Sequence, residues 1–221
     1  LGTTSVIAFI PGFISTTAAT RSIGVTQPLL SLPVIQDVGS GLQGGGNSAT
    51  LSASQHGGVT VHIESSAPGL ALVSSSSTTA GTAFVDVFVA NGNTAAQYYV
   101  HGVENTAGFA NIVVSCPGFT GANRDVSIVQ PGVDMAGLSA SIDTIDPADV
   151  FLVRVGLPSA NNSSIGTPQV VRAGSPGLTA TITHTQPLVG ELETTPLTGQ
   201  TVMVTIAALS NQSPSNVAAG G

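Results

Sequence analysis

The chain has no lysine and no tryptophan, and only 7% of its 221 residues are charged. Its four basic residues are all arginine and stand against eleven acidic ones, which gives a net charge of −7. Nucleic acid and anionic lipid surfaces are bound through clustered basic side chains. The composition therefore excludes a cationic binding face for either partner. The absence of lysine also excludes a lysine–asparagine isopeptide crosslink within the chain.

The single cysteine, Cys116, excludes an internal disulfide, and its place in an apolar segment predicts a small buried side chain. No apolar run approaches the ~20 residues of a membrane helix. The longest run, from Val6 to Ile14, is interrupted by Pro11 and Gly12, so we expect no membrane insertion. The chain begins without methionine or a visible signal peptide. We therefore expect a mature or excised piece of an extracellular or cell-surface protein.

What the chain does contain is typical of β-strands. Glycine (27) and proline (13) are plentiful, and valine and isoleucine dominate the apolar residues. Apolar residues alternate in Val59–Ile63, which indicates a half-buried strand with His62 facing solvent. Eight strands are predicted in the first half of the chain: Ile23–Gln27, Leu30–Ile35, Ser48–Ser54, Val59–Glu64, Leu70–Ser74, Ala83–Ala90, Ala95–Val103 and Phe109–Ser115. Seven or eight short strands in about 100 residues are typical of an immunoglobulin-like sandwich.

The chain also repeats itself with a period of about 105 residues, which indicates domains in tandem. Ser5–Phe13 matches Asn111–Phe119, and both are apolar runs that end in Pro-Gly-Phe. Arg21–Pro28 likewise matches Arg124–Pro131. The fold class that we predict is all-β, with two tandem immunoglobulin-like β-sandwich domains and an N-terminal donor-like strand. Six valine and isoleucine residues are expected in the first core: Val59, Val61, Ile63, Val85, Val87 and Val89.

We divide the chain into an N-terminal strand segment (residues 1–20), a first domain (residues 21–123) and a second domain (residues 124–221). The second domain repeats the plan of the first, since Gly177–Ile182 aligns with Gly58–Ile63. After Leu209 the residues become small and polar, and none of them match Phe109–Phe119. We therefore expect the second domain to lack its last strand.

The repeats resemble a known family. The pattern Val-Thr-Val-x-Ile-x-Ser-x-x-Pro-Gly in Val59–Gly69 is followed by Gly-Thr-Ala in Gly81–Val89 and by a strand ending in Pro-Gly-Phe in Gly102–Phe119. With a weaker match in Val170–Leu192, the chain resembles the bacterial immunoglobulin-like repeats of surface and secreted proteins. The resemblance implies spacers, stalks, fibre subunits or adhesive modules. It marks a fold and carries no catalytic residue.

Motifs that could carry chemistry have simpler explanations. Gly39–Gly44 fits the G-x-G-x-x-G pattern, but a strand and not a helix is predicted after it, so we expect a loop without a phosphate site. Asp143, Asp146 and Asp149 could collect around calcium, but their spacing differs from known calcium loops, and Pro147 favours a solvated acidic turn. A calcium site is the open alternative here.

Enzyme activity is not expected. The four histidines lack the close spacing of metal sites, and no Gly-x-Ser-x-Gly elbow is present. We predict no catalytic residues and no cofactor. Three glycosylation sequons, which matter only in a host that modifies secreted proteins, begin at Asn161, Asn162 and Asn211.

The asymmetry of the ends suggests a function. An apolar strand stands at the front of the chain, and a domain short of a strand stands at the back. We expect a structural subunit of an extracellular filament, in which copies of the chain bind head-to-tail by donating this strand to the second domain of the next copy. The donor residues are Val6, Ile7, Phe9, Ile10, Pro11 and Phe13. The alternative is a pair of spacer or stalk repeats from a larger adhesin or surface protein.

Overall fold

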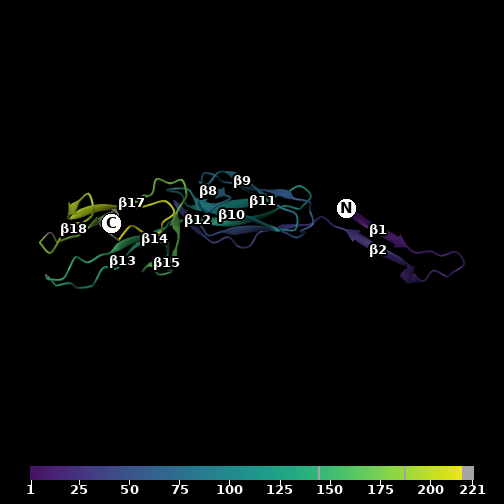
Figure 1. The fold of residues 1–221 in the computed structure, drawn as a ribbon, viewed down its shortest axis with the longest axis horizontal. Helices are drawn as coiled ribbons and strands as arrows, with labels where there is room; N and C mark the ends of the chain where they lie inside the picture. Colours follow the sequence, from purple (N-terminus) through teal and green to yellow (C-terminus); the bar gives the residue numbers. More distant parts are fainter. Residues whose placement is uncertain (144, 187, 216–221) are drawn as a thin grey trace.

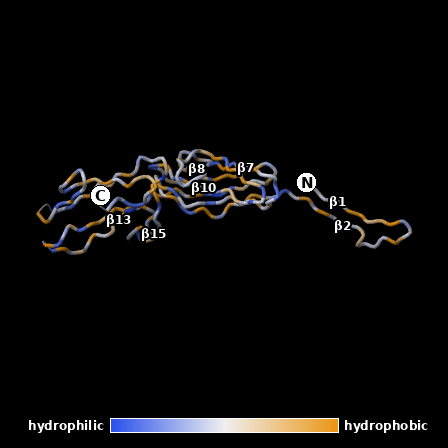
Figure 2. Tube along the Cα trace, in the orientation of Figure 1, coloured by the Kyte–Doolittle hydropathy of each residue, from blue (hydrophilic) through white to orange (hydrophobic). Residues whose placement is uncertain are grey.

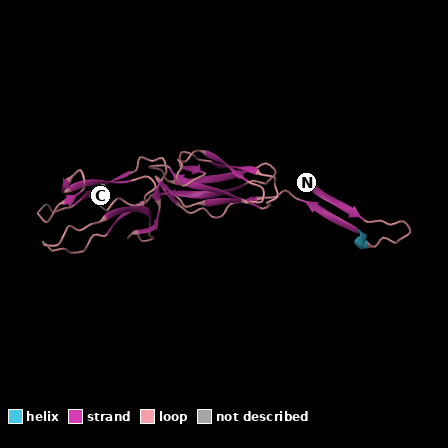
Figure 3. Ribbon diagram, viewed as in Figure 1, coloured by secondary structure: helices cyan, strands magenta, loops and turns pink. Residues whose placement is uncertain are grey.

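The computed structural model describes residues 1–143, 145–186 and 188–215. It consists of strands and loops, apart from the single 3-10 turn η1 (Thr17–Ala19) (Figure 3). The predicted all-β class is confirmed. Three parts follow one another along an elongated molecule (Figure 1): an N-terminal hairpin, a first unit (residues 28–130) and a second unit (residues 131–215).

The hairpin consists of β1 (Gly2–Ile7) and β2 (Thr20–Val25), which pair antiparallel from Gly2 opposite Val25 to Ile7 opposite Thr20. It forms a separate two-stranded sheet and projects from one end of the molecule (Figure 1). Every residue of both strands is exposed. Apolar residues nevertheless recur along it (Figure 2), so the hairpin presents an apolar surface to solvent.

The first unit consists of two sheets around one core. One sheet contains β3 (Leu30–Ser31), β5 (Leu42–Gln43), β6 (Asn47–Leu51), β8 (Ala71–Ser74) and β10 (Ala95–Gly102). The other has the order β4-β12-β11-β7-β9, with β4 (Val38–Gly39), β7 (Val59–Ser65), β9 (Phe84–Val89), β11 (Gly108–Ser115) and β12 (Ala122–Val129). Both sheets contribute to the buried cluster, which contains or contacts all six residues expected in the core.

The eight predicted strands all overlap an observed strand. Ile23–Gln27, which we expected at the start of the first domain, overlaps β2 of the N-terminal hairpin. The prediction for Leu30–Ile35 was too long, because only Leu30–Ser31 pairs with a neighbour. Pro33 follows directly, and proline has no N–H to donate to a ladder.

The boundary between the two units differs from the predicted one. We expected a second domain to begin at Arg124, but residues 124–129 belong to β12 of the first unit, which pairs antiparallel with β11 and parallel with β4. Val126 and Ile128 are buried in the first core. Because these side chains complete that core, the chain leaves the first unit only after Val129.

The second unit contains three small sheets. They comprise β13 (Gly132–Ala136), β14 (Leu152–Pro158) and β15 (Ile165–Pro168); β17 (Leu178–Thr183) and β20 (Thr201–Ile206); and β18 (Leu192–Glu193) with β19 (Thr198–Gly199). The remaining strand, β16 (Val170–Val171), pairs with β5 of the first unit. Five residues of the second unit form a core cluster together with Leu42: Val153, Val155, Val171, Val204 and Ile206.

The path of the second unit repeats that of the first. Val133 pairs with Val155 as Leu30 pairs with Leu51, and β17 pairs with β20 as β7 pairs with β9. Residues 211–213 then lie beside β14, as the start of β10 lies beside β6. Within the described ranges, nothing in the second unit corresponds to β11 and β12.

Several contacts join the two units. β16 pairs with β5, and the Gln169 side chain accepts from the Gly39 N–H and donates to the Asp37 carbonyl, both at 2.8 Å. The Arg172 guanidinium donates to both carboxylate oxygens of Glu104, at 2.6 and 2.8 Å. Backbone pairing, an amide clamp and a two-point ion pair together restrict rotation between the units.

Candidate functional site

The N-terminal hairpin is a second copy of the β11–β12 hairpin. Gly2 lies opposite Val25 as Gly108 lies opposite Ile128, and the pairing continues in the same register along both hairpins. Each first strand then enters the same turn, where Phe13 N–H donates to the Ile10 carbonyl and Phe119 N–H donates to the Cys116 carbonyl, both at 3.1 Å. The sequence repeat is therefore also a repeat of backbone conformation.

Both turns require glycine. Gly12 and Gly118 have φ angles of 82° and 83°, in the left-handed region that residues with a Cβ rarely adopt. This explains why the two runs share Pro-Gly-Phe, and it places Phe13 and Phe119 at equivalent points after the turn.

The β11–β12 hairpin shows which face of such a hairpin is buried. Its inward side chains lie in the first core: Ala110, Ile112, Val114, Cys116, Phe119, Val126 and Ile128. The equivalent positions of the N-terminal hairpin are Thr4, Val6, Ala8, Ile10, Phe13, Ile23 and Val25. Five of these are large and apolar, and their exposed fractions are 55% for Val6, 61% for Ile10, 72% for Phe13, 48% for Ile23 and 55% for Val25.

The predicted donor residues divide between the two faces of this hairpin. Val6, Ile10 and Phe13 occupy positions that are buried in the first unit, whereas Ile7 and Phe9 correspond to Val113 and Ser115, which are not. Pro11 corresponds to Pro117 in the turn. The donor strand expected from the sequence is one half of a hairpin, because β1 pairs with β2 of the same chain.

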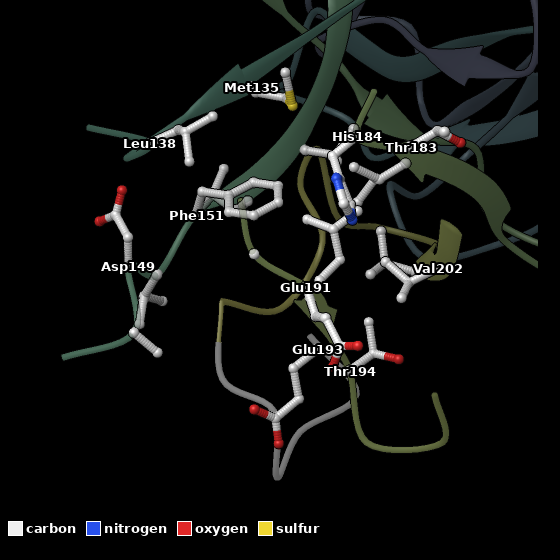
Figure 4. A pocket seen from close by; sticks show the side chains of 18 of the residues that line it. Met135, Leu138, Asp149, Phe151, Thr183, His184, Glu191, Glu193, Thr194 and Val202 are labelled. Atoms are coloured by element: carbon white, nitrogen blue, oxygen red, sulfur yellow. The ribbon is translucent and has the colours of Figure 1, made fainter. Parts of the chain in front are cut away.

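In the ranges that the structure describes, the second unit is open where the first unit holds its hairpin. In the first unit β7 lies between β9 and β11, whereas β17, its counterpart, pairs only with β20 in the part of the chain that the structure describes. A cavity of about 560 Å³ lies beside β17. Met135, Leu138 and Phe151 lie on one side of it and Thr183, His184 and Val202 on the other (Figure 4).

The rim of this cavity carries negative charge. Asp149, Glu191 and Glu193 line it, and Figure 4 shows Asp149 on the side of Leu138 and Phe151 and Glu193 below them. His184 Nε2 is buried without a hydrogen-bond partner among the described residues. The floor is therefore apolar, while the rim would favour a ligand without acidic groups.

The acidic segment that contains Asp143, Asp146 and Asp149 forms a loop, in which carboxylates accept hydrogen bonds from backbone N–H groups. Asp143 N–H donates to Asp146 Oδ2 at 2.7 Å, and Ser139 N–H donates to Asp149 Oδ2 at 2.6 Å. The described residues contain no group of three or more His, Cys, Asp or Glu side chains placed to hold a metal. Two of the three carboxylates thus accept backbone hydrogen bonds.

The other residues singled out from the sequence have structural positions. Gly39–Gly44 spans β4 and β5 and leads to β6, so no helix follows it. Cys116 is buried. His62 is partly exposed, and its Nδ1 lies 2.7 Å from Asp86 Oδ1. The sequons at Asn161 and Asn162 lie on an exposed turn, and that at Asn211 lies beside β14.

Sequence reasoning missed a buried histidine near the junction of the units. His101 is fully buried, and its Nε2 lies 2.8 Å from Ser74 Oγ. Burial and, to a smaller extent, the positive charge of Arg172 together lower the pKa of His101 to about 4. The hydrogen bonds from Arg172 hold the pKa of Glu104 below its ordinary value. Because Arg172 is 71 positions from His101 in the chain, no local sequence pattern predicts that His101, Arg172 and Glu104 lie close together.

Scans against family models and against curated proteins found no match to this chain. None of the described residues forms a helix long and apolar enough to cross a membrane.

Proposed function

We propose that this chain is a structural subunit of an extracellular filament, in which the β1–β2 hairpin of one copy fills the open cavity of the second unit of the next copy. One observation carries the proposal. A hairpin with the register and apolar face of β11–β12 is exposed at one end of the molecule, and at the other end no described residue takes the place that such a hairpin has in the first unit.

The first unit supplies the register of this contact. Val114 lies opposite Ile63 and Val113 opposite Glu64. Transferred to the equivalent strands, Ala8 lies opposite Ile182 and Ile7 opposite Thr183. The donated β1 then adds a strand to the free edge of β17, with backbone hydrogen bonds along the edge and side chains in the cavity.

Hydrophobic burial would make the joint strong. Full burial of a large apolar side chain contributes about 1.5–3 kcal/mol, and five such side chains on the hairpin are now about half to three-quarters exposed. Their transfer to the cavity is worth about 4–9 kcal/mol before the costs of association. It also removes an exposed apolar strand, which is an aggregation hazard.

The shape of the subunit favours an open chain of copies. The hairpin and the second unit, which contains the cavity, lie at opposite ends of the molecule (Figure 1), and the contacts around β16 and Arg172 resist bending between the units. A copy therefore cannot fill its own cavity. A contact between different surfaces that does not close on itself generates a filament.

The second candidate is a pair of spacer repeats in a longer surface protein. β2 runs into the first unit through Gln27–Pro28, as β12 runs into the second through Gln130–Pro131. In this candidate, the hairpin belongs to a preceding module of the same chain. Both candidates are structural roles of immunoglobulin-like modules outside the cell, with no catalysis, no cofactor and no nucleic-acid partner.

Paired cysteines test the proposed contact. In a Cys116→Ala background, we would combine Ile7→Cys with Thr183→Cys, two exposed side chains that the proposed register places opposite each other. Mild oxidation should produce a ladder of multimers on a non-reducing gel. The matched control, Ile7→Cys with Thr179→Cys, keeps the same faces but moves the partner by four residues and should give almost none. A ladder of equal strength from both pairs, or from neither, would contradict the proposal.

A further inference from the structure

The second strand of a seated hairpin is held on its far side as well. In the first unit, Ile128 pairs in parallel with Val38, and Val129 pairs with Gly39. Arg124, near the start of β12, donates from Nη2 to the Leu32 carbonyl at 3.2 Å. β12 is therefore gripped between β11 and the segment from residue 32 to residue 39.

That segment also supplies a wall of the core. Leu32, Ile35 and Val38 are spaced three residues apart, and each is at most 6% exposed. They belong to the same buried cluster as Val126 and Ile128 of β12. These three side chains are therefore buried in the same core as the inward side chains of β12.

The second unit has equivalent apolar side chains, but there they are exposed. Because Val133 pairs with Val155 as Leu30 pairs with Leu51, Met135 corresponds to Leu32. Leu138 and Ile142 follow at spacings of three and four residues, and the chain has one more residue between Val133 and Val155 than between Leu30 and Leu51. Met135 and Leu138 are 54% exposed, Ile142 is 61% exposed, and all three line the cavity.

We propose that β2 also docks on the second copy, where it pairs in parallel with residues 141–143. In the same contact, Arg21 donates a hydrogen bond to the Met135 carbonyl of that copy. This rests on the proposed function and adds a second edge to it. Arg21 and Val25 stand in the hairpin where Arg124 and Ile128 stand in β12. Val25 therefore lies opposite Ile142, and Thr26 lies opposite Asp143.

Charge is consistent with a second copy as the occupant. Arg21 is the only residue with a charged side chain in the hairpin, residues 1–27. It would approach a surface that carries Asp143, Asp146 and Asp149. The hydrogen bonds from Ser139 to Asp149 and from Asp143 to Asp146 already shape the loop, so that residues 141–143 lie exposed beside the cavity.

The consequence is a hairpin captured along both of its edges. β1 takes β17 as an antiparallel neighbour, and β2 takes residues 141–143 as a parallel one. Withdrawal of the hairpin then requires both edges to separate and the wall of Met135, Leu138 and Ile142 to return to water, which slows dissociation of the joint.

A second cysteine pair tests this edge separately from the first. In the full chain with Cys116→Ala, Thr26→Cys and Asp143→Cys should give a multimer ladder on oxidation. The control pair, Ser22→Cys with Asp143→Cys, is displaced by four residues along β2 and should give almost none.

The two experiments have distinguishable outcomes. A ladder from Ile7→Cys/Thr183→Cys, together with none from Thr26→Cys/Asp143→Cys, would overturn the parallel edge and leave the proposed function standing. A ladder as strong from the displaced control would overturn it as well. Failure of both registered pairs would overturn the edge and the filament together.

The arginine contact has its own measurement in the full-length chain. Loss of a hydrogen bond from a charged donor should raise the dissociation constant of the joint about tenfold in Arg21→Gln. Arg21→Lys keeps the charge and should raise it less. An unchanged dissociation constant in Arg21→Gln would remove Arg21 from the proposed interface.

Discussion

Val6→Asp should abolish assembly, whereas Ile7→Asp should barely affect it. The two residues are neighbours on β1, and both are more than half exposed in the isolated chain. Alternate side chains of a strand point to opposite faces. In the proposed joint Val6 takes the position of fully buried Ile112, and Ile7 takes the position of Val113, which is only partly buried.

The magnitude follows from this difference in burial. Val6→Asp forfeits about half of the 1.5–3 kcal/mol that a buried apolar side chain contributes. It also places a carboxylate in an apolar cavity, which costs several kcal/mol even after relaxation. A total of about 4 kcal/mol corresponds to about a thousandfold weaker association. Ile7→Asp leaves its charge in water and should change the affinity by less than about tenfold.

Sedimentation velocity over a range of concentrations measures both affinities. The melting temperature of the first unit provides the control, because neither side chain contacts that unit, and it should be the same in both variants and the original chain. Equal effects of the two substitutions, or a larger effect of Ile7→Asp, would refute the reasoning. The second result would mean that the strand is seated one residue out of register, since such a slip exchanges the two faces.

Three further predictions concern the individual units. Ile112→Ala should lower the free energy of unfolding by about 2–5 kcal/mol in denaturant titrations, because it leaves a cavity in the first core, while Val6→Ala should leave the unassembled chain as stable as before. Stability should fall as the pH drops from 6.5 towards 4 by up to about 1.4 kcal/mol per pH unit, since the unfolded chain binds a proton on His101 that the folded chain excludes until its pKa of about 4; His101→Gln should flatten this dependence and His56→Gln should not. EDTA should leave the melting temperature unchanged, whereas a fall of several degrees would favour a calcium site at Asp143, Asp146 and Asp149.

Local residue patterns predicted the strands, their inward faces and the repeated turn of this structure. The alternation in Val59–Ile63 predicted a strand and its inward face, because side-chain direction in a strand depends only on position along it. Pro33 shortened a predicted strand for an equally local reason. The repeat of Pro-Gly-Phe identified two equivalent turns, since the φ angles near 80° at Gly12 and Gly118 require glycine wherever the turn occurs.

The sequence by itself determined the all-β class, the repeat and the apolar faces of its strands, because these depend on neighbours along the chain. Only the tertiary structure decided which sheet each strand joins. β12 completes the first unit because Val126 and Ile128 are buried in its core, although the repeat alone assigned residues 124–129 to the next domain. The open edge of β17, the cavity beside it and the Arg172–Glu104 pair likewise depend on residues that are distant in the chain. Periodicity states which side chains share a face, but burial of that face depends on what the rest of the chain places against it.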